Sequence, residues 1–163
     1  MKLYGIVGWK NAGKTTLVER LLAETAGRGL RVSTVKHAHH GFEIDRPGKD
    51  SFRHRAAGAH EVLVLGGQRW ALMHELAGDA APPLAALLAR LSPVDLVLVE
   101  GFKRDSHPKI EVWRGGAAPL AMTDETVRAL ASPQPPPGLQ RPWLALDDIP
   151  TIADFILGDL ALR

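Results

Sequence analysis

The residues with the clearest chemistry lie near the amino end of the chain, where residues 8–15 read GWKNAGKT. This stretch matches G-x-x-x-x-G-K-[ST], the pattern of a phosphate-binding loop (P-loop). Its two glycines let the backbone turn so that successive N–H groups, and the positive end of the following helix dipole, point at one anion. Lys14 supplies an ammonium group for β- and γ-phosphates, and the Thr15 hydroxyl is a suitable ligand for Mg²⁺. We therefore expect a bound nucleotide to contact Gly8, Asn11, Ala12, Gly13, Lys14, Thr15 and Thr16.

A second candidate is the acid that ends an apolar run at residues 95–101, which read DLVLVEG. Such a run is typical of a central parallel strand that is buried on both faces and carries a carboxylate at its tip. Only Glu100 lies at the carboxyl end of this strand, where the phosphates are expected. We predict that Glu100 orients the attacking water as the catalytic residue, or holds Mg²⁺ together with Thr15. The alternative is an acid that merely ends a core strand.

Histidines and basic residues gather after the second expected strand, and five of the seven histidines lie between His37 and His60. Loops that follow the strands of a parallel sheet lie on its ligand side, so this loop is expected beside the P-loop. We predict that its cations bind phosphate or a phosphorylated partner ligand. The residues assigned to this role, including one from the loop after Glu100, are Lys36, His37, His39, His40, Arg46, Lys49, Arg53 and Lys103.

Two other interpretations of the histidine-rich loop stay open. His37, His39 and His40 supply imidazole nitrogens that could bind a transition metal, although no cysteine or matched ligand pair accompanies them. The segment could also be a solvated loop without a ligand. Asp45 or Asp50 could in addition reach Mg²⁺ through water, as switch loops do in other P-loop proteins.

The elements that would position these residues can be read from periodicity. Residues 3–7 predict a buried strand, residues 14–26 an amphipathic helix and residues 31–36 a second strand, which together form a βαβ unit. Residues 37–48 predict a loop, and a short helix follows to residue 57. The runs 61–65 and 69–74 around Gly-Gly-Gln predict a hairpin at one edge of the sheet. A helix is expected over residues 84–91.

The remaining pattern completes an α/β fold. Residues 109–114 alternate in a way that predicts a half-exposed strand, and residues 127–131 and 143–146 predict two more strands. A turn-rich linker covers residues 133–142, and Asp147 or Asp148 is expected to cap a helix over residues 150–160. We predict one P-loop nucleotide-binding domain over residues 1–163, with a P-loop NTPase-type, mostly parallel sheet flanked by helices.

Composition narrows the class of protein. The 163 residues include 45% hydrophobic and 23% charged side chains, which is typical of a globular protein. A formal net charge of +2 without a long basic run indicates no nucleic-acid partner. No apolar run approaches the roughly 18 residues that a membrane span needs, and the chain contains no cysteine. Cleavage of a signal peptide would destroy the P-loop, so we expect a cytoplasmic protein with no membrane partner.

Several stretches together resemble the MobB adapter proteins of molybdopterin-guanine dinucleotide biosynthesis. They are the P-loop, VKHAHH at residues 35–40, DRPGKDS at residues 45–51 followed by Arg53, His54 and Arg55, and LVEGFK at residues 98–103. The likeness covers roughly the first 115 residues. The P-loop alone is shared by many NTPases, whereas its combination with the histidine-rich loop and the strand end is far more specific.

The resemblance implies a homodimeric protein that binds GTP and Mg²⁺ and hydrolyses GTP weakly if at all. It further implies a partner, the guanylyltransferase that attaches GMP to molybdopterin, and molybdopterin itself as a second ligand. Asn11 is the only asparagine, so the chain has no N-K-x-D motif for guanine. Trp9 stands where related dimeric ATPases carry a signature lysine. The alternatives are a small-molecule kinase in which Glu100 is the base, and a metallochaperone NTPase that uses the three histidines.

Overall fold

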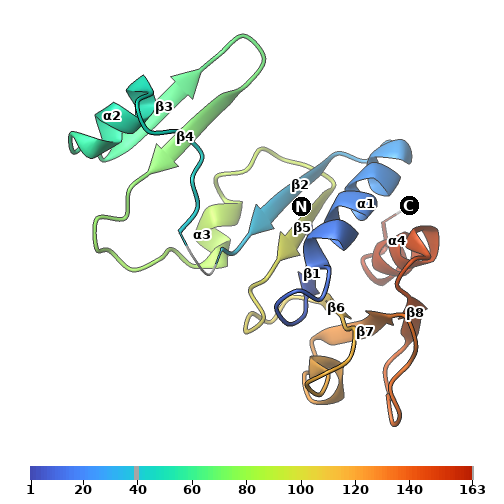
Figure 1. Ribbon diagram of the computed structural model, residues 1–163. Coiled ribbons are helices and arrows are strands. Elements are labelled where there is room, and N and C mark those ends of the chain that lie inside the picture. The colour runs from blue at the N-terminus through green and yellow to red at the C-terminus, as the bar shows by residue number, and fades with distance from the viewer. Residues whose placement is uncertain (39–40, 163) are drawn as a thin grey trace. The chain divides into compact units, whose positions relative to one another are not determined.

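The computed structural model describes residues 1–38 and 41–162 of the chain. Its main element is a six-stranded sheet with the strand order β2-β5-β1-β6-β7-β8, in which every neighbouring pair is parallel (Figure 1). The sheet confirms the predicted α/β class with a mostly parallel sheet. Its strands are β1 Lys2–Val7, β2 Val32–Lys36, β5 Leu96–Glu100, β6 Lys109–Val112, β7 Val127–Ser132 and β8 Trp143–Ala145.

Two helices cover one face of this sheet, α1 Lys14–Gly27 and α4 Ile149–Asp159. They contact each other and lie side by side in Figure 1. Because side chains alternate between the faces of a strand, Tyr4 and Ile6 of β1 point toward the helices, and Val7 lies on the other face. The larger core joins the first two to apolar residues of both helices, so the start of α1 is held against the end of β1. The short helix η1 Leu120–Met122 packs on the opposite face.

The strand β6 corrects one prediction. Its alternating sequence predicted a half-exposed strand, but all four residues are buried, because β6 lies inside the sheet between β1 and β7. The two charged side chains find partners there. Lys109 Nζ donates to the carbonyl of Asp105 and, at 2.6 Å, to Thr126 Oγ1. Glu111 Oε2 accepts a hydrogen bond of 2.9 Å from the backbone N–H of Ala121.

Contacts within the chain define two compact units, residues 1–37 with 87–163, and residues 38–86. The second unit contains α2 Asp50–Ala56, β3 Glu61–Leu65 and β4 Trp70–His74, and the boundary falls inside α3 Leu84–Leu88. The predicted hairpin is present, but the prediction that it extends an edge of the main sheet is wrong. The strands β3 and β4 pair only with each other, and α2 packs on β3. None of the described helices is long and apolar enough to cross a membrane.

Arg55 joins three segments of the second unit. Its guanidinium donates to both carboxylate oxygens of Asp45, at 2.7 and 3.1 Å, and to Glu75 Oε1 at 2.6 Å. The side chain of Asp45 is only 7% exposed, and the hydrogen bonds from Arg55 hold the pKa of this carboxyl below its usual range. Val62 and Leu84 are the buried apolar residues among the described part of this unit. The hydrogen bonds of Arg55 to Asp45 and Glu75 therefore stabilise this unit together with its few buried apolar side chains.

We expect Arg55→Met to loosen this unit, because the mutation leaves Asp45 screened from solvent without its partner. Hydrogen exchange of residues 45–75 should become about tenfold faster. Arg53→Met is the matched control on the same helix, since Arg53 is exposed and its ion pair with Asp50 is loose, at 3.8 Å. Equal exchange rates in the two variants would show that Arg55 does not stabilise the unit.

Candidate functional site

The P-loop lies between the end of β1 and the start of α1, as the motif requires. Gly8 has φ +146°, and a Cβ atom on it would lie 2.4 Å from the carbonyl oxygen of Val112 on β6, so no larger residue fits. Gly13 has φ +96° and directly precedes the helix, and Asn11 also has a positive φ of 63°. This backbone turns the amino end of α1 toward the carboxyl edge of the sheet, which is the geometry for anion binding.

The side chain of Lys14 folds back over the loop. Its Nζ atom donates a hydrogen bond of 2.9 Å to the carbonyl oxygen of Trp9. Burial lowers the pKa of Lys14, and the nearby ammonium of Lys103 lowers it further. A negative phosphate would relieve both effects by stabilising the charged form of Lys14. We therefore expect the Lys14 ammonium to leave the carbonyl oxygen of Trp9 and to bind a phosphate when a nucleotide is present.

The structure brings Thr15 and Glu100 together. Glu100 is the partner of Ile6 in the parallel ladder between β5 and β1, so its side chain reaches the carboxyl edge beside the P-loop. Thr15 Oγ1 donates to Glu100 Oε1 at 2.9 Å, and the Glu100 side chain is 12% exposed. A hydroxyl and a carboxylate oxygen form the hard donor set that Mg²⁺ takes at P-loops. The residues present therefore fit this ion.

Lys36 belongs to the same site. The β2–β5 ladder places it beside Glu100, and its Nζ lies 3.5 Å from Glu100 Oε1 and 3.3 Å from Thr15 Oγ1. The backbone N–H of His37 donates to the Glu100 carbonyl at 2.9 Å, and its ring lies 4.8 Å from the ring of Phe102. Lys36 is thus close to the P-loop, whereas His37 packs on the turn after β5.

Two residues of this site were missed by sequence reasoning. Trp9 carries the ammonium of Lys103 over its ring, with Nζ 4.2 Å from the ring centroid. Arg114 follows β6, and its Nε donates to the carbonyl of Ala12 at 3.1 Å. The available signal for Arg114 was its place just beyond the carboxyl end of a parallel strand, where ligand-binding residues gather.

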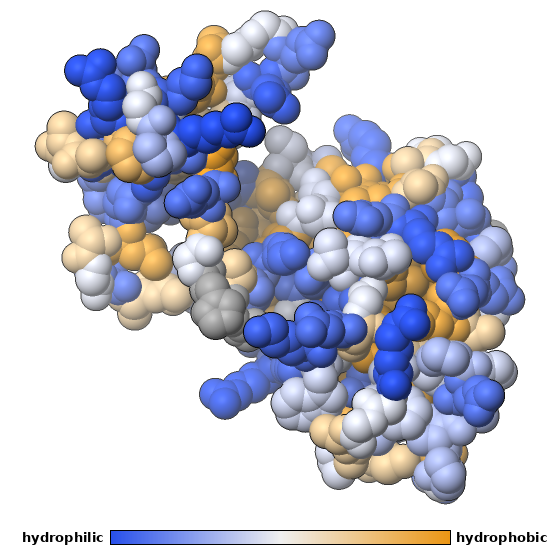
Figure 2. All heavy atoms as spheres, viewed as in Figure 1, coloured by the Kyte–Doolittle hydropathy of each residue, from blue (hydrophilic) through white to orange (hydrophobic). Residues whose placement is uncertain are grey.

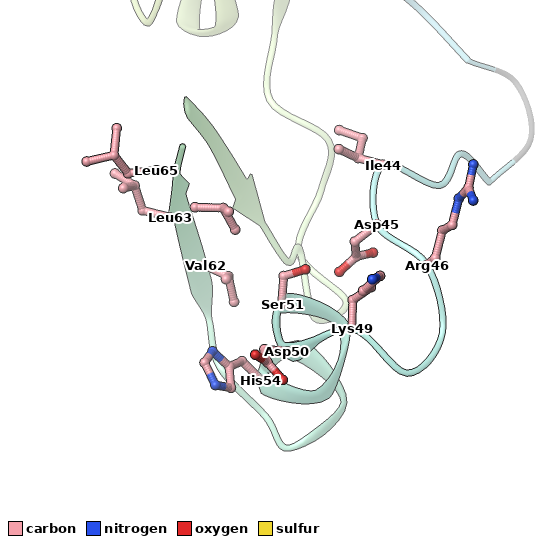
Figure 3. Close-up of a pocket in the computed structure, with 11 residues that line it drawn as sticks. Ile44, Asp45, Arg46, Lys49, Asp50, Ser51, His54, Val62, Leu63 and Leu65 are labelled. Carbon is pink, nitrogen blue, oxygen red and sulfur yellow. The ribbon is translucent and has the colours of Figure 1, made fainter. Parts of the chain in front are cut away.

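The other predicted cations lie in the second unit. Arg46 and Lys49 line a pocket of about 680 Å³ between the loop before α2, the helix itself and β3 (Figure 3). Ser51 and His54 of α2 also line it, whereas Arg53 borders a different hollow beside Phe52. The predicted ligands His39 and His40 lie outside the described residues. Across residues 1–38 and 41–162, no three His, Cys, Asp or Glu side chains gather as a metal-binding group.

The sheet is parallel, a P-loop follows its central strand β1, and an acid lies at the tip of the adjacent strand β5. These features define the P-loop NTPase-like class of α/β proteins. Solved structures agree with this class. The chain superposes on the crystal structure of Bacillus subtilis MobB with a TM-score of 0.77, 29% identity and 98% coverage of both chains. For a MobB homologue from Bacillus stearothermophilus the TM-score is 0.73 at 28% identity, with complete coverage of both chains.

The family itself is shown by sequence. The family model of MobB, described as molybdopterin guanine dinucleotide synthesis protein B, matches residues 3–133. The molybdopterin-guanine dinucleotide biosynthesis adapter protein of Haemophilus influenzae is 42% identical over 155 residues, which cover 94% of this chain and 86% of that protein. The adapter protein of the same name from Escherichia coli is 39% identical, with 95% and 91% coverage. The chain belongs to the MobB family.

Proposed function

We propose that this protein is a GTP-binding adapter of molybdopterin-guanine dinucleotide biosynthesis. It would bind GTP and Mg²⁺ in the P-loop site as a homodimer and assist the guanylyltransferase that attaches GMP to molybdopterin. The names of the relatives support this function over the kinase and metallochaperone alternatives. A cytoplasmic location follows from the proposal, since GTP is available there.

The observation that carries the nucleotide proposal is the pair Thr15 and Glu100, 2.9 Å apart beside Lys14. Mg²⁺, when bound, would neutralise phosphate charge, and these two side chains would hold it. Lys14, Lys36 and Lys103 bring three ammonium groups to this edge, where the Glu100 carboxylate lies. Such a charge excess favours a polyphosphate over a single phosphate.

The same contacts support weak hydrolysis. Glu100 accepts a hydrogen bond from Thr15 and lies 3.5 Å from the ammonium of Lys36. A carboxylate whose Oε1 atom is occupied by Thr15 and Lys36, and which would also hold Mg²⁺, is poorly placed to contact the attacking water. A bound triphosphate would then persist long enough to be presented to a partner enzyme.

Molybdopterin is the proposed second ligand, and the pocket of the second unit is its candidate site. Lys49, Arg46 and His54 supply cationic or hydrogen-bonding groups for a phosphate, and Val62 lines the apolar side. Figure 3 shows Asp45 and Lys49 with their polar ends turned toward each other near Ser51. Arg55 pairs with Asp45, so Arg46 and Lys49 face Asp50 as the other charged side chains of the lining. A phosphorylated, partly flat ligand fits this chemistry.

The homodimer proposal is supported by exposed apolar side chains of the hairpin, of which Leu63 and Leu65 also border the pocket described above. Cross-strand pairing places Leu63 opposite Leu72, and Leu65 opposite Trp70, on one face. Leu63, Leu65 and Trp70 are 62%, 76% and 63% exposed. Figure 2 shows hydrophobic residues at the surface among hydrophilic ones in the part that carries α2, β3 and β4. A second copy would cover such a face with an identical one, as a two-fold interface requires.

We expect the double variant Leu65→Glu, Trp70→Glu to raise the dimer dissociation constant by about 100-fold, because two large apolar contacts are lost and charges are introduced. Sedimentation velocity over a concentration series measures this. Met122→Glu is the matched control, since Met122 is also exposed, at 43%, but lies on η1. If the double variant has the same dimer dissociation constant as the wild-type protein, the hairpin is not the dimer interface.

The adapter role itself is tested by transfer of GMP. The wild-type protein is added to purified guanylyltransferase, molybdopterin and Mg²⁺-GTP, and the initial rate of dinucleotide formation is measured. We expect the rate to rise with protein concentration and then to saturate, as a stoichiometric complex requires. A rate equal to that with an unrelated protein would refute the adapter role.

A further inference from the structure

Lys103 has an unusual position for a residue that follows a central strand. Its ammonium lies over the ring of Trp9, 4.2 Å from the centroid, and Trp9 directly follows the first glycine of the P-loop. Lys14 donates to the carbonyl oxygen of the same residue. Two ammonium groups from distant parts of the sequence therefore meet at Trp9, one at its ring and one at its backbone.

The backbone after β5 is shaped to produce this contact. Gly101 has φ +95°, and the next residue, Phe102, also has a positive φ of 51°, which a bulky residue rarely adopts. These two residues turn the chain sharply, so that Lys103 returns over the P-loop. The ring of Phe102 packs against the ring of His37, which supports the turn.

A buried carboxyl on β6, that of Glu111, interacts electrostatically with Lys103. Glu111 is fully buried, and its Oε1 atom has no hydrogen-bond partner among the described residues. Burial raises the pKa of Glu111, and the charge of Lys103 opposes this rise. Lys103 thus contacts the Trp9 ring and interacts electrostatically with Glu111, and no ion pair among the described residues holds its ammonium in place.

We propose that Lys103 binds the terminal phosphate of a nucleoside triphosphate held by the P-loop of its own chain, and leaves the Trp9 ring when it does so. The inference rests on the proposed function only in that the P-loop binds a nucleoside polyphosphate. A charge-assisted hydrogen bond to phosphate is stronger than a cation–π contact at a partly exposed site. The exchange is therefore favourable when a third phosphate is present.

This exchange would make the site distinguish triphosphate from diphosphate. The backbone N–H groups of the P-loop bind the inner phosphates, and Lys14 reaches the β- and γ-phosphates. Lys103 adds a further ammonium whose effect grows with the charge of the last phosphate. Its release from Trp9 would also alter residues 101–108, so that the loop after β5 reports which nucleotide is bound.

Calorimetric titration tests the proposal with the β,γ-imido analogue of GTP and with GDP, both with Mg²⁺. We expect Lys103→Met to weaken binding of the analogue about tenfold, equal to about 1.4 kcal/mol, and binding of GDP less than about twofold. Arg104→Met is the matched control, because it removes an exposed neighbouring charge, and both affinities should stay within about twofold. Equal losses for both nucleotides, or no loss, would overturn the proposal.

The fluorescence of Trp9 shows whether Lys103 responds to the terminal phosphate or only stabilises the loop. The emission of Trp9 is obtained as the difference between the wild-type protein and Trp9→Phe. We expect the triphosphate analogue to change this emission, GDP to leave it unchanged, and Lys103→Met to lose the response. The same Trp9 signal with both nucleotides would contradict the exchange.

The same titrations are repeated with the β,γ-imido analogue of ATP and with ADP, the adenine pair. These titrations distinguish a failure of the GTP proposal from a failure of the Lys103 proposal. If the wild-type protein binds adenine and not guanine nucleotides, the GTP assignment fails, and the Lys103 comparison is made with the adenine pair. If the protein binds neither pair, both proposals fall together.

Discussion

Replacing Lys14 with alanine is expected to weaken Mg²⁺-GTP binding by about 100-fold, because a charge-assisted hydrogen bond to phosphate contributes about 1.5 to 3 kcal/mol. The loss should be almost entirely in affinity, since Lys14 donates to a loop carbonyl in the structure and its removal leaves no buried carboxylate unpaired. Isothermal titration calorimetry with the imido analogue of GTP measures the change.

Arg104→Ala is the control for a general loss of positive charge, because Arg104 is exposed and lies next to Lys103. This variant should bind within about twofold of the wild-type protein. The melting temperature of both variants should match that of the wild-type protein. Tight nucleotide binding by Lys14→Ala would mean that the P-loop is not the nucleotide site.

The second large effect concerns Mg²⁺. Glu100→Gln keeps the size of the side chain and removes its charge, so we expect the gain in affinity that Mg²⁺ gives to GTP to fall about tenfold. Affinity measured in EDTA should change much less. Thr15→Val should act in the same direction, and the double variant should lose less than the two single losses combined, because both side chains would hold one ion.

Asp95→Asn is the matched control for Glu100→Gln. Asp95 precedes β5 at its opposite end, and its carboxylate accepts a hydrogen bond of 2.8 Å from the N–H of Arg31. The variant changes the same charge on the same segment, away from the P-loop. An unchanged Mg²⁺ effect in Glu100→Gln would show that Glu100 does not hold the ion.

Much of the fold was predictable because its signals are local. The P-loop, the helix that follows it and the apolar strand that ends at Glu100 are each determined by short stretches of sequence. The general rule that ligands bind at the carboxyl ends of parallel strands then predicted that Thr15 and Glu100 lie together. The hydrogen bond between them agrees with that expectation. Their roles in binding remain to be tested.

The features that sequence reasoning missed depend on contacts between distant segments. The burial of Lys109 and Glu111 follows from the place of β6 inside the sheet, which the alternation of a single strand does not reveal. The contact of Lys103 with Trp9 needs the turn at Gly101, and Arg114 reaches the P-loop only because β6 adjoins β1. The sequence pattern of the hairpin indicates that its two strands pair with each other. It does not show whether they also pair with the main sheet, which is why the predicted position at the sheet edge is wrong.

The most direct measurement compares the wild-type protein with Lys14→Ala in the GMP transfer assay, at a GTP concentration that saturates the guanylyltransferase. We expect the wild-type protein to raise the rate of dinucleotide formation, and Lys14→Ala to leave the rate at that of the transferase alone. Stimulation by Lys14→Ala equal to that of the wild-type protein would contradict a nucleotide-dependent adapter.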